Sequence, residues 1–249
     1  MAGLPTALRR WGDGPPVVLL HGVPTSGWLW SRLGPRLAAA GFGVLAPDLP
    51  GLGQSARPQR WTLDAYGAWL EALLDPMGPT HLVGQDFGGL VAAWGASRGL
   101  ARSLCLVSCP LSRVWWGAKV TARPPLRGPL YRWFAGRLYV MSAVQPSARE
   151  ALSSGLELGT RDLALRMEAI ALALDPAQIA ALPERLPPGL RTLLLWGTDD
   201  RMFGLRHARS TQRALPGAVL RTISGARHGL PFDHAAAAAA ELIPLLKGR

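Results

Sequence analysis

The sequence of 249 residues has few cysteines and tyrosines, and it has no long apolar run. A membrane-spanning helix needs roughly 20 apolar residues in succession, and the polyalanine run 235–240 is far shorter. The first residues, MAGLPTALRRWGDGPP, also lack the apolar segment of a secretory signal peptide. We therefore expect a cytoplasmic protein with no membrane partner.

The two cysteines, Cys105 and Cys109, lie four residues apart in the apolar run SLCLVSC. On a strand they would be about 13 Å apart, which is too far for a disulfide. We expect two buried thiols in a reducing compartment. No other ligand type lies near them, so the sequence implies neither a metal nor a cofactor.

Acidic residues are absent from Phe87 to Arg149, although the chain carries a formal net charge of +11. Nine basic side chains fall in that segment, and they must project a positive field. Such a field could attract an anionic substrate, a membrane surface or nucleic acid, or it could be an ordinary solvated surface. No nucleic-acid-binding motif accompanies it, so we expect no nucleic-acid partner. The substrate that we expect is a small molecule. The oligomeric state is not encoded in any motif.

Apolar runs that read as buried strands alternate with amphipathic stretches along most of the chain. Strands are expected at 15–22, 42–51, 80–86, 103–109, 191–197 and 218–225, and helices at 28–41, 62–78, 88–99, 205–215 and 233–246. This alternation predicts a mostly parallel, doubly wound α/β sheet covered on both faces. Between Pro110 and Pro188 the rhythm breaks into proline-rich, helical sequence. We predict a core of residues 1–110 and 188–249 with a helical cap at 111–187.

The stretch GQDFG, residues 84–88, has the G-x-S-x-G pattern with Asp86 in place of serine. That pattern marks a sharp turn from strand to helix that exposes the side chain at its tip. A carboxylate there lies beside a helix N-terminus, where negative charge is favoured. It can act as a nucleophile without a base to deprotonate it. The alternative is that Asp86 merely caps the following helix.

Two further features favour catalysis because of their order along the chain. Asp199 and Asp200 follow the apolar run TLLLWG, and His228 follows the last expected strand. In open α/β sheets, functional groups gather at the carboxyl ends of the strands. Nucleophile, acid and histidine in this order is the arrangement of an α/β-hydrolase triad.

The motifs HGVPTSGWLW (21–30), GQDFGG (84–89), WGTDDRMF (196–203) and GARHG (225–229) together resemble the α/β-hydrolase superfamily. The resemblance covers essentially the whole chain and implies the α/β-hydrolase fold. Within the superfamily the chain is similar to the aspartate-nucleophile branch, which contains haloalkane dehalogenases and epoxide hydrolases.

The resemblance also implies roles for individual residues. Asp86 would form an ester with the substrate, His228 would activate water, and Asp200 would orient His228, with Asp199 as the alternative acid. The backbone N–H groups of Val23 and Phe87 would form the oxyanion hole.

The leaving group decides between the two activities. Dehalogenases of this branch carry tryptophan after the nucleophile and often asparagine in H-G-N-P, whereas this chain has Phe87 and Val23. Phenylalanine has no N–H to donate to a halide. Epoxide hydrolases protonate the opening oxygen with cap tyrosines, for which the chain offers Tyr131 and Tyr139.

The sequence therefore slightly favours an epoxide hydrolase. Haloalkane dehalogenase is the alternative, because HGVPTSGWLW is dehalogenase-like and a cap indole could replace the missing donor. The candidate indoles are those of Trp115, Trp116 and Trp133. A further alternative is a ligand-binding protein of the same fold without turnover.

Overall fold

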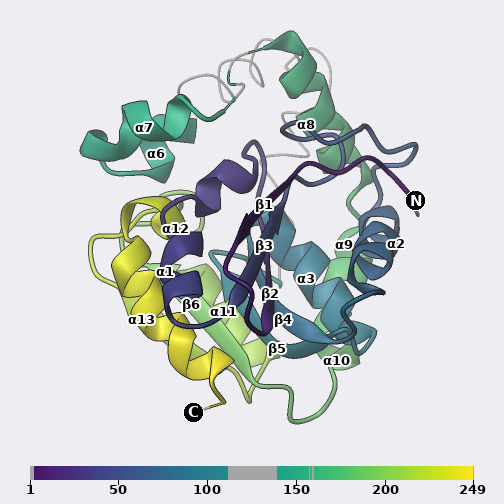
Figure 1. Cartoon of the computed structure of the whole chain (residues 1–249), viewed down its shortest axis with the longest axis vertical. Coiled ribbons are helices and arrows are strands. Elements are labelled where there is room, and N and C mark those ends of the chain that lie inside the picture. The colour runs from purple at the N-terminus through teal and green to yellow at the C-terminus, as the bar shows by residue number, and fades with distance from the viewer. Residues whose placement is uncertain (1–2, 112–138, 157, 159, 249) are drawn as a thin grey trace.

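A seven-stranded sheet forms the centre of the computed structural model, which describes residues 3–111, 139–156, 158 and 160–248 (Figure 1). The sheet order is β1-β3-β2-β4-β5-β6-β7. Only β1 is antiparallel to its neighbour; the other pairs are parallel, as predicted. The strands are β1 (Leu8–Trp11), β2 (Pro16–Leu20), β3 (Gly43–Pro47), β4 (Thr80–Gln85), β5 (Ala101–Val107), β6 (Thr192–Gly197) and β7 (Val219–Ile223).

Helices cover both faces of the sheet, which explains why its central strands are apolar on both sides. One face carries α2 (Leu63–Leu74), α3 (Phe87–Ser97) and α11 (Leu205–Ala214), and the other carries α1 (Gly34–Ala39), α12 (Leu230–Asp233) and α13 (Ala235–Leu246). Successive residues of a strand alternate between the two layers, so Val18 and Leu20 pack on one side and Val17 and Leu19 on the other. Cys105 and Cys109 are free and buried, as predicted.

The prediction of one continuous helix over residues 28–41 is wrong. The chain instead forms a 3₁₀ turn, η1 (Gly27–Trp30), and then α1. Pro35 has no N–H to donate to the carbonyl of Ser31, so it cannot lie in the interior of a helix and is instead in the first turn of α1. Gly34 lies against Trp11, where a Cβ atom would come within 2.4 Å of the ring.

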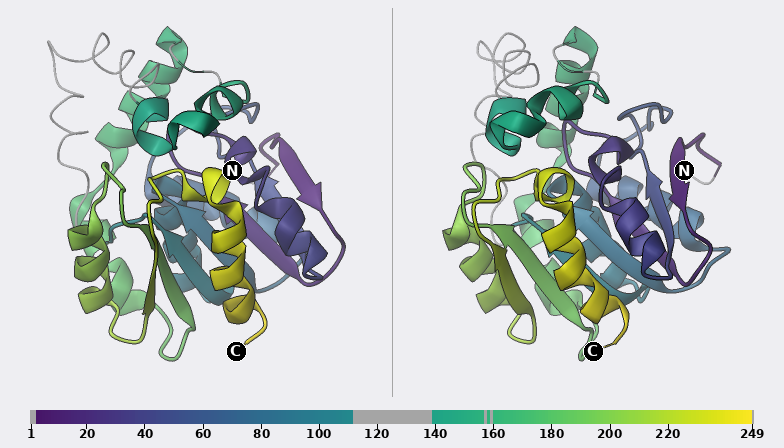
Figure 2. Two further views of the ribbon diagram at one scale, coloured as in Figure 1. Left: turned by 90° about the vertical axis from the view of Figure 1, so that its left-hand side faces the viewer. Right: turned by 60° about the vertical axis from the view of Figure 1, so that its left-hand side comes forward.

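The described residues between β5 and β6 are helical and include no strand. They form α6 (Tyr139–Ala143), η3 (Pro146–Ala148), α7 (Arg149–Ser153), α8 (Arg161–Ala173), α9 (Pro176–Ala180) and α10 (Leu182–Arg185). Figure 2 shows α6 and α7 above the sheet edge, whereas α10 contacts α3 on the flank of the sheet. The cap boundaries 111–187 stay a prediction.

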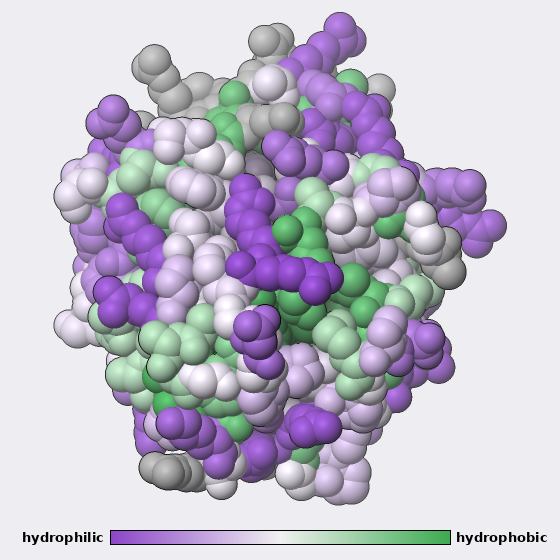
Figure 3. All heavy atoms as spheres, viewed as in Figure 1, coloured by the Kyte–Doolittle hydropathy of each residue, from purple (hydrophilic) through white to green (hydrophobic). Residues whose placement is uncertain are grey.

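The surface seen in Figure 3 mixes hydrophilic and hydrophobic side chains, with purple residues around a small green area. Among the described residues, no helix combines the length and the apolar character needed to cross a membrane.

The turn between β4 and α3 forces Asp86 into an unusual backbone conformation, with φ of 52° and ψ of −122°. Positive φ is uncommon for a residue with a side chain and is a form of strain found at functional sites. The flanking glycines permit the turn because the backbone passes so close to its neighbours. A Cβ atom on Gly84 would lie 2.3 Å from the carbonyl oxygen of Gly88, and one on Gly88 would lie 2.2 Å from that of Leu20.

We expect Gly88→Ala to lower the free energy of unfolding by about 1–3 kcal/mol, because the added methyl group overpacks the contact with Leu20. Urea unfolding would measure the change. Gly217→Ala is the matched control, since no atom lies within 4 Å of a Cβ there, and it should leave stability equal or slightly raised. Equal effects of the two substitutions would contradict the packing argument.

Candidate active site

Three side chains from separate loops meet at the carboxyl edge of the sheet. Asp86 follows β4, Asp200 follows β6 and His228 follows β7. These strands are parallel and lie in one half of the sheet, so their carboxyl ends open onto the same edge. Asp86 and Asp200, which are 114 residues apart in the sequence, thereby meet His228, which follows Asp200 by 28 residues.

His228 is fully buried between the two carboxylates. Its Nδ1 lies 2.9 Å from Oδ2 of Asp200, and its Nε2 lies 3.4 Å from Oδ2 of Asp86. Asp199 is exposed and accepts a hydrogen bond from the Thr198 hydroxyl at 3.0 Å. The structure thus brings Asp200, and not Asp199, to the histidine.

Asp200 is fixed by its own loop as well as by His228. The backbone N–H groups of Met202 and Phe203 donate to Oδ1, each at 2.8 Å. Burial by itself raises the pKa of Asp200, but the charge and hydrogen bond of His228, with the hydrogen bond from the Phe203 N–H, hold the pKa below its usual value. Asp200 therefore stays ionised and can orient the imidazole.

The two oxygens of Asp86 have different surroundings. Oδ1 accepts a hydrogen bond of 2.6 Å from the N–H of Phe87, while Oδ2 faces His228. A Cβ atom on Gly22 would lie 3.0 Å from Oδ1, so the loop carrying Val23 passes close to that oxygen. The Phe87 N–H thus lies against Oδ1, and the oxyanion hole formed by Phe87 and Val23 stays a prediction.

Opposing effects set the pKa of His228. Desolvation lowers it, but the charges and hydrogen bonds of Asp200 and Asp86 raise it more, to about 10. The histidine is thus held as a cation while both carboxylates are ionised. Any reaction that neutralises Asp86 lowers the pKa of His228.

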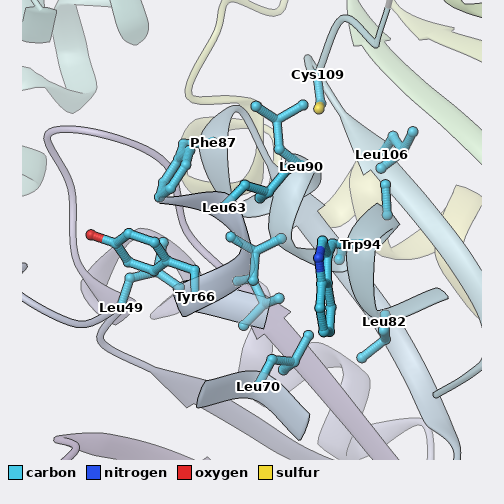
Figure 4. Packing of buried hydrophobic residues seen from close by; sticks show 14 of the residues in the cluster. Leu49, Leu63, Tyr66, Leu70, Leu82, Phe87, Leu90, Trp94, Leu106 and Cys109 are labelled. Atoms are coloured by element: carbon cyan, nitrogen blue, oxygen red, sulfur yellow. The ribbon is translucent and has the colours of Figure 1, made fainter. Parts of the chain in front are cut away.

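The ring of Phe87 belongs to the hydrophobic core and does not offer a polar group to the site. It is 4% exposed and packs edge to face on Tyr66, with the ring centres 4.8 Å apart (Figure 4). The Tyr66 hydroxyl points elsewhere, to the carbonyl of Pro50 at 2.9 Å. Phe87 contributes its backbone N–H alone.

Tyr139, the first residue of α6, packs its ring against His228 with the centres 6.5 Å apart. Its hydroxyl is buried and has no hydrogen-bond partner among the described residues. Burial and the charges of Asp86 and Asp200 raise its pKa well above the usual value, so it stays protonated. The other four predicted leaving-group residues, Tyr131, Trp115, Trp116 and Trp133, lie outside the described residues.

Two buried polar residues at the site, Gln85 and Ser108, were not predicted from the sequence. Gln85, at the end of β4, places its amide nitrogen 2.8 Å from Nε2 of His228. Ser108 follows β5 with φ of 46° and helps to lower the pKa of Asp200. The signal for Gln85 was a polar residue at the end of an otherwise apolar strand, next to the strained aspartate.

His21, in the HGVP loop, has a structural place. Its Nδ1 donates to the carbonyl of Gly22 at 2.8 Å, and its Nε2 accepts the N–H of Leu49 at the same distance. Burial lowers its pKa. A neutral His21 therefore holds the loop beside Asp86. Within the described ranges, no group of three acidic, histidine or cysteine side chains is arranged to hold a metal ion.

We expect Asp86→Asn to lower the pKa of His228 by about one pH unit or more, because one of the two charges that favour the cation is removed. Titration of the histidine ring nitrogens by NMR would measure it. Asp199→Asn removes an exposed carboxylate that does not contact His228, and it should leave the pKa nearly unchanged. An unchanged pKa in Asp86→Asn would contradict this account of the site.

Known proteins share both the sequence pattern and the fold. A sequence profile described as the Alpha/beta hydrolase family matches residues 17–242. The chain is 27% identical to the uncharacterized protein Rv2715 of Mycobacterium tuberculosis, over 92% of this chain and 74% of that protein. It is 42% identical to a haloalkane dehalogenase of Mycobacterium marinum, but only over 32% of this chain and 28% of the relative.

A thermophilic esterase from Thermogutta terrifontis has the same fold. Its structure superposes with a TM-score of 0.81 at 22% sequence identity, covering 98% of this chain and 93% of the esterase. At that identity the likeness concerns the fold alone, which agrees with the mostly parallel sheet and its flanking helices. With the profile match over most of its length, the chain belongs to the alpha/beta hydrolase family.

Proposed function

We propose that this hydrolase uses Asp86 as a nucleophile to open an epoxide through an ester intermediate. The observation that carries the proposal is the asymmetry of the Asp86 carboxylate. Oδ1 is held by the Phe87 N–H, and Oδ2 is directed toward His228 at 3.4 Å. A serine at this turn suits acyl transfer, whereas a carboxylate suits displacement at a saturated carbon.

In the first step Oδ2 of Asp86 attacks a ring carbon of the epoxide and the carbon–oxygen bond breaks. The electron pair stays on the departing oxygen, which takes a proton from the Tyr139 hydroxyl. The products are an ester on Asp86 and a tyrosinate. Loss of the Asp86 charge removes one of the causes that raise the pKa of Tyr139, so ester formation eases its ionisation.

In the second step His228 takes a proton from water, whose oxygen adds to Cγ of the ester. The negative charge that develops on Oδ1 is stabilised by the N–H of Phe87, already 2.6 Å away. Collapse breaks the bond between Cγ and Oδ2, and the leaving alkoxide takes the proton from His228. The acid proton left over returns to Tyr139, so epoxide and water give a diol.

The charges of the site suit this order of events. Both carboxylates hold His228 as a cation in the resting protein. The ester neutralises Asp86, so the pKa of His228 falls and its Nε2 proton is lost to solvent before the imidazole acts as a base. His228 takes up a proton from solvent again when the free carboxylate of Asp86 is restored. Asp200 remains ionised and stabilises the imidazolium as it forms.

Haloalkane dehalogenation is the second candidate. The haloalkane dehalogenase of Mycobacterium marinum, 42% identical over its aligned part, favours it. The ester and its hydrolysis would be the same, with a halide as leaving group. A halide needs N–H donors, and the Phe87 ring supplies none, so tryptophans of segment 112–138 would have to do so.

We expect His228→Gln protein to accumulate the ester, because attack by water has lost its base. Intact mass after exposure to a panel of alkyl halides and epoxides would measure it. A gain equal to the whole epoxide indicates ring opening. A gain equal to the halide compound less hydrogen halide indicates dehalogenation.

The double variant Asp86→Asn/His228→Gln is the control, since its amide cannot form the ester. No adduct from either class, or an adduct that persists in the double variant, would contradict the proposed nucleophile and favour a ligand-binding role without turnover.

We expect Tyr139→Phe to slow ester formation from an epoxide by about 100-fold or more, the usual contribution of a general acid. Ester formation from an alkyl halide, whose leaving group needs no proton, should change little in the same variant. Rates of adduct formation in the His228→Gln background measure both. Equal slowing with the two substrates would show that Tyr139 supports the pocket without acting as the acid.

A further inference from the structure

Gln85 is a fully buried polar residue that contacts the histidine of the site. It ends β4 and immediately precedes Asp86, and it reaches across to a residue 143 positions away in the sequence. Its amide nitrogen lies 2.8 Å from Nε2 of His228 and 3.4 Å from the carbonyl oxygen of the same residue. Buried amides need hydrogen-bond partners, and the described partners of this amide nitrogen are both atoms of His228.

The surroundings of the amide favour one orientation. The carbonyl oxygen of His228 can only accept, so the NH₂ group is the end of the amide that suits this contact of 3.4 Å. The opposite end, Oε1, faces Gly22, where a Cβ atom would lie 2.4 Å away. Turning the amide over would set Oε1 against the backbone oxygen. The NH₂ group therefore also faces Nε2 of His228.

A ring nitrogen that accepts a hydrogen bond carries no proton. The proton of a neutral His228 is then on Nδ1, where Oδ2 of Asp200 accepts it at 2.9 Å. This is the tautomer that can take a proton from water, because Nε2 is the nitrogen that faces Asp86.

We propose that Gln85 is a positioning residue that donates a hydrogen bond to Nε2 of neutral His228 and so stabilises the form able to act as a base.

The titratable groups around His228 act in the opposite direction. Asp200 and Asp86 both favour the cation, and the Tyr139 hydroxyl beside the ring is neutral. The Phe203 ring on another side is apolar. Gln85 opposes the carboxylates, since its N–H and the N–H of a protonated Nε2 would repel each other. In the proposed reaction, water replaces the amide as the partner of Nε2 once Asp86 is esterified.

This inference deepens the proposed function, and its test uses no substrate. We compare Asp86→Asn protein with Asp86→Asn/Gln85→Met protein, both labelled with ¹⁵N-histidine, by NMR titration of the ring nitrogens. Methionine matches the length of glutamine without its donor. The Asp86→Asn background removes one carboxylate and brings the titration of His228 to lower pH.

We expect the pKa of His228 to rise by about one pH unit when Gln85 is replaced, because the neutral form loses a hydrogen bond. His81, which contacts Ser103 and not Gln85, is the internal control and should titrate identically in both proteins. A pKa that is unchanged or lower after replacement would overturn the proposal, since a lower value means that the amide stabilised the cation.

A second measurement covers the case in which the double variant does not fold. In Asp86→Asn protein labelled with ¹⁵N-glutamine, the side-chain amide signal of Gln85 should move with the midpoint of the His228 titration. A signal that stays constant through that titration would overturn the proposal. Failure to trap an ester with any substrate would count against the proposed function alone, because neither titration depends on turnover.

Discussion

The structure of the candidate site depends on one constraint, the strained turn at Asp86. A positive φ at this residue points its carboxylate above the sheet edge, where His228 can reach it. The turn exists because Gly84 and Gly88 let strand, helix and the neighbouring β2 pass closer than any side chain would permit. The same close packing directs the N–H of Phe87 onto Oδ1. The backbone strain, the hydrogen bond to Oδ1 and the direction of Oδ2 toward His228 thus have one origin.

The electrostatic interactions of Asp86, Asp200 and His228 follow from their positions at the carboxyl ends of β4, β6 and β7. Two carboxylates flank one imidazole that has no contact with solvent, so each charge acts across a poorly screened interior. Asp200 is held ionised by His228 and by two backbone donors, which makes it a fixed charge. Within the part of the chain that the structure describes, Oδ2 of Asp86, the oxygen that faces the histidine, has no such pair of fixed donors. The site therefore combines the fixed negative charge of Asp200 with the negative charge of Asp86, which ester formation would remove.

Two polar neighbours of His228 come from distant parts of the chain. Gln85 occupies a variable position of the GQDFG turn at the end of β4, and Tyr139 begins the short helix α6. Oε1 of Gln85 and the hydroxyl of Tyr139 are buried and have no hydrogen-bond partner among the described residues. Gln85 approaches the imidazole through its amide nitrogen, and Tyr139 packs against it through its ring.

The sequence by itself determined the mostly parallel sheet, six of its seven strands, and the chain order of aspartate, acid and histidine, whereas β1 was not expected. These follow from local periodicity and turn residues, which act over a few positions. That chain order is also what favours a catalytic Asp86 over a simple helix cap, and the catalytic role stays a prediction. The prediction of one helix over 28–41 was wrong, because the apolar spacing favours a continuous helix whereas Pro35 interrupts it.

Only the tertiary structure decided that Asp200 and not Asp199 faces His228, that the Phe87 ring packs into the core, and that Gln85 touches the imidazole. Each depends on how side chains from distant strand ends are rotated against one another. No local pattern encodes such rotations, because they are set by the packing of the whole sheet.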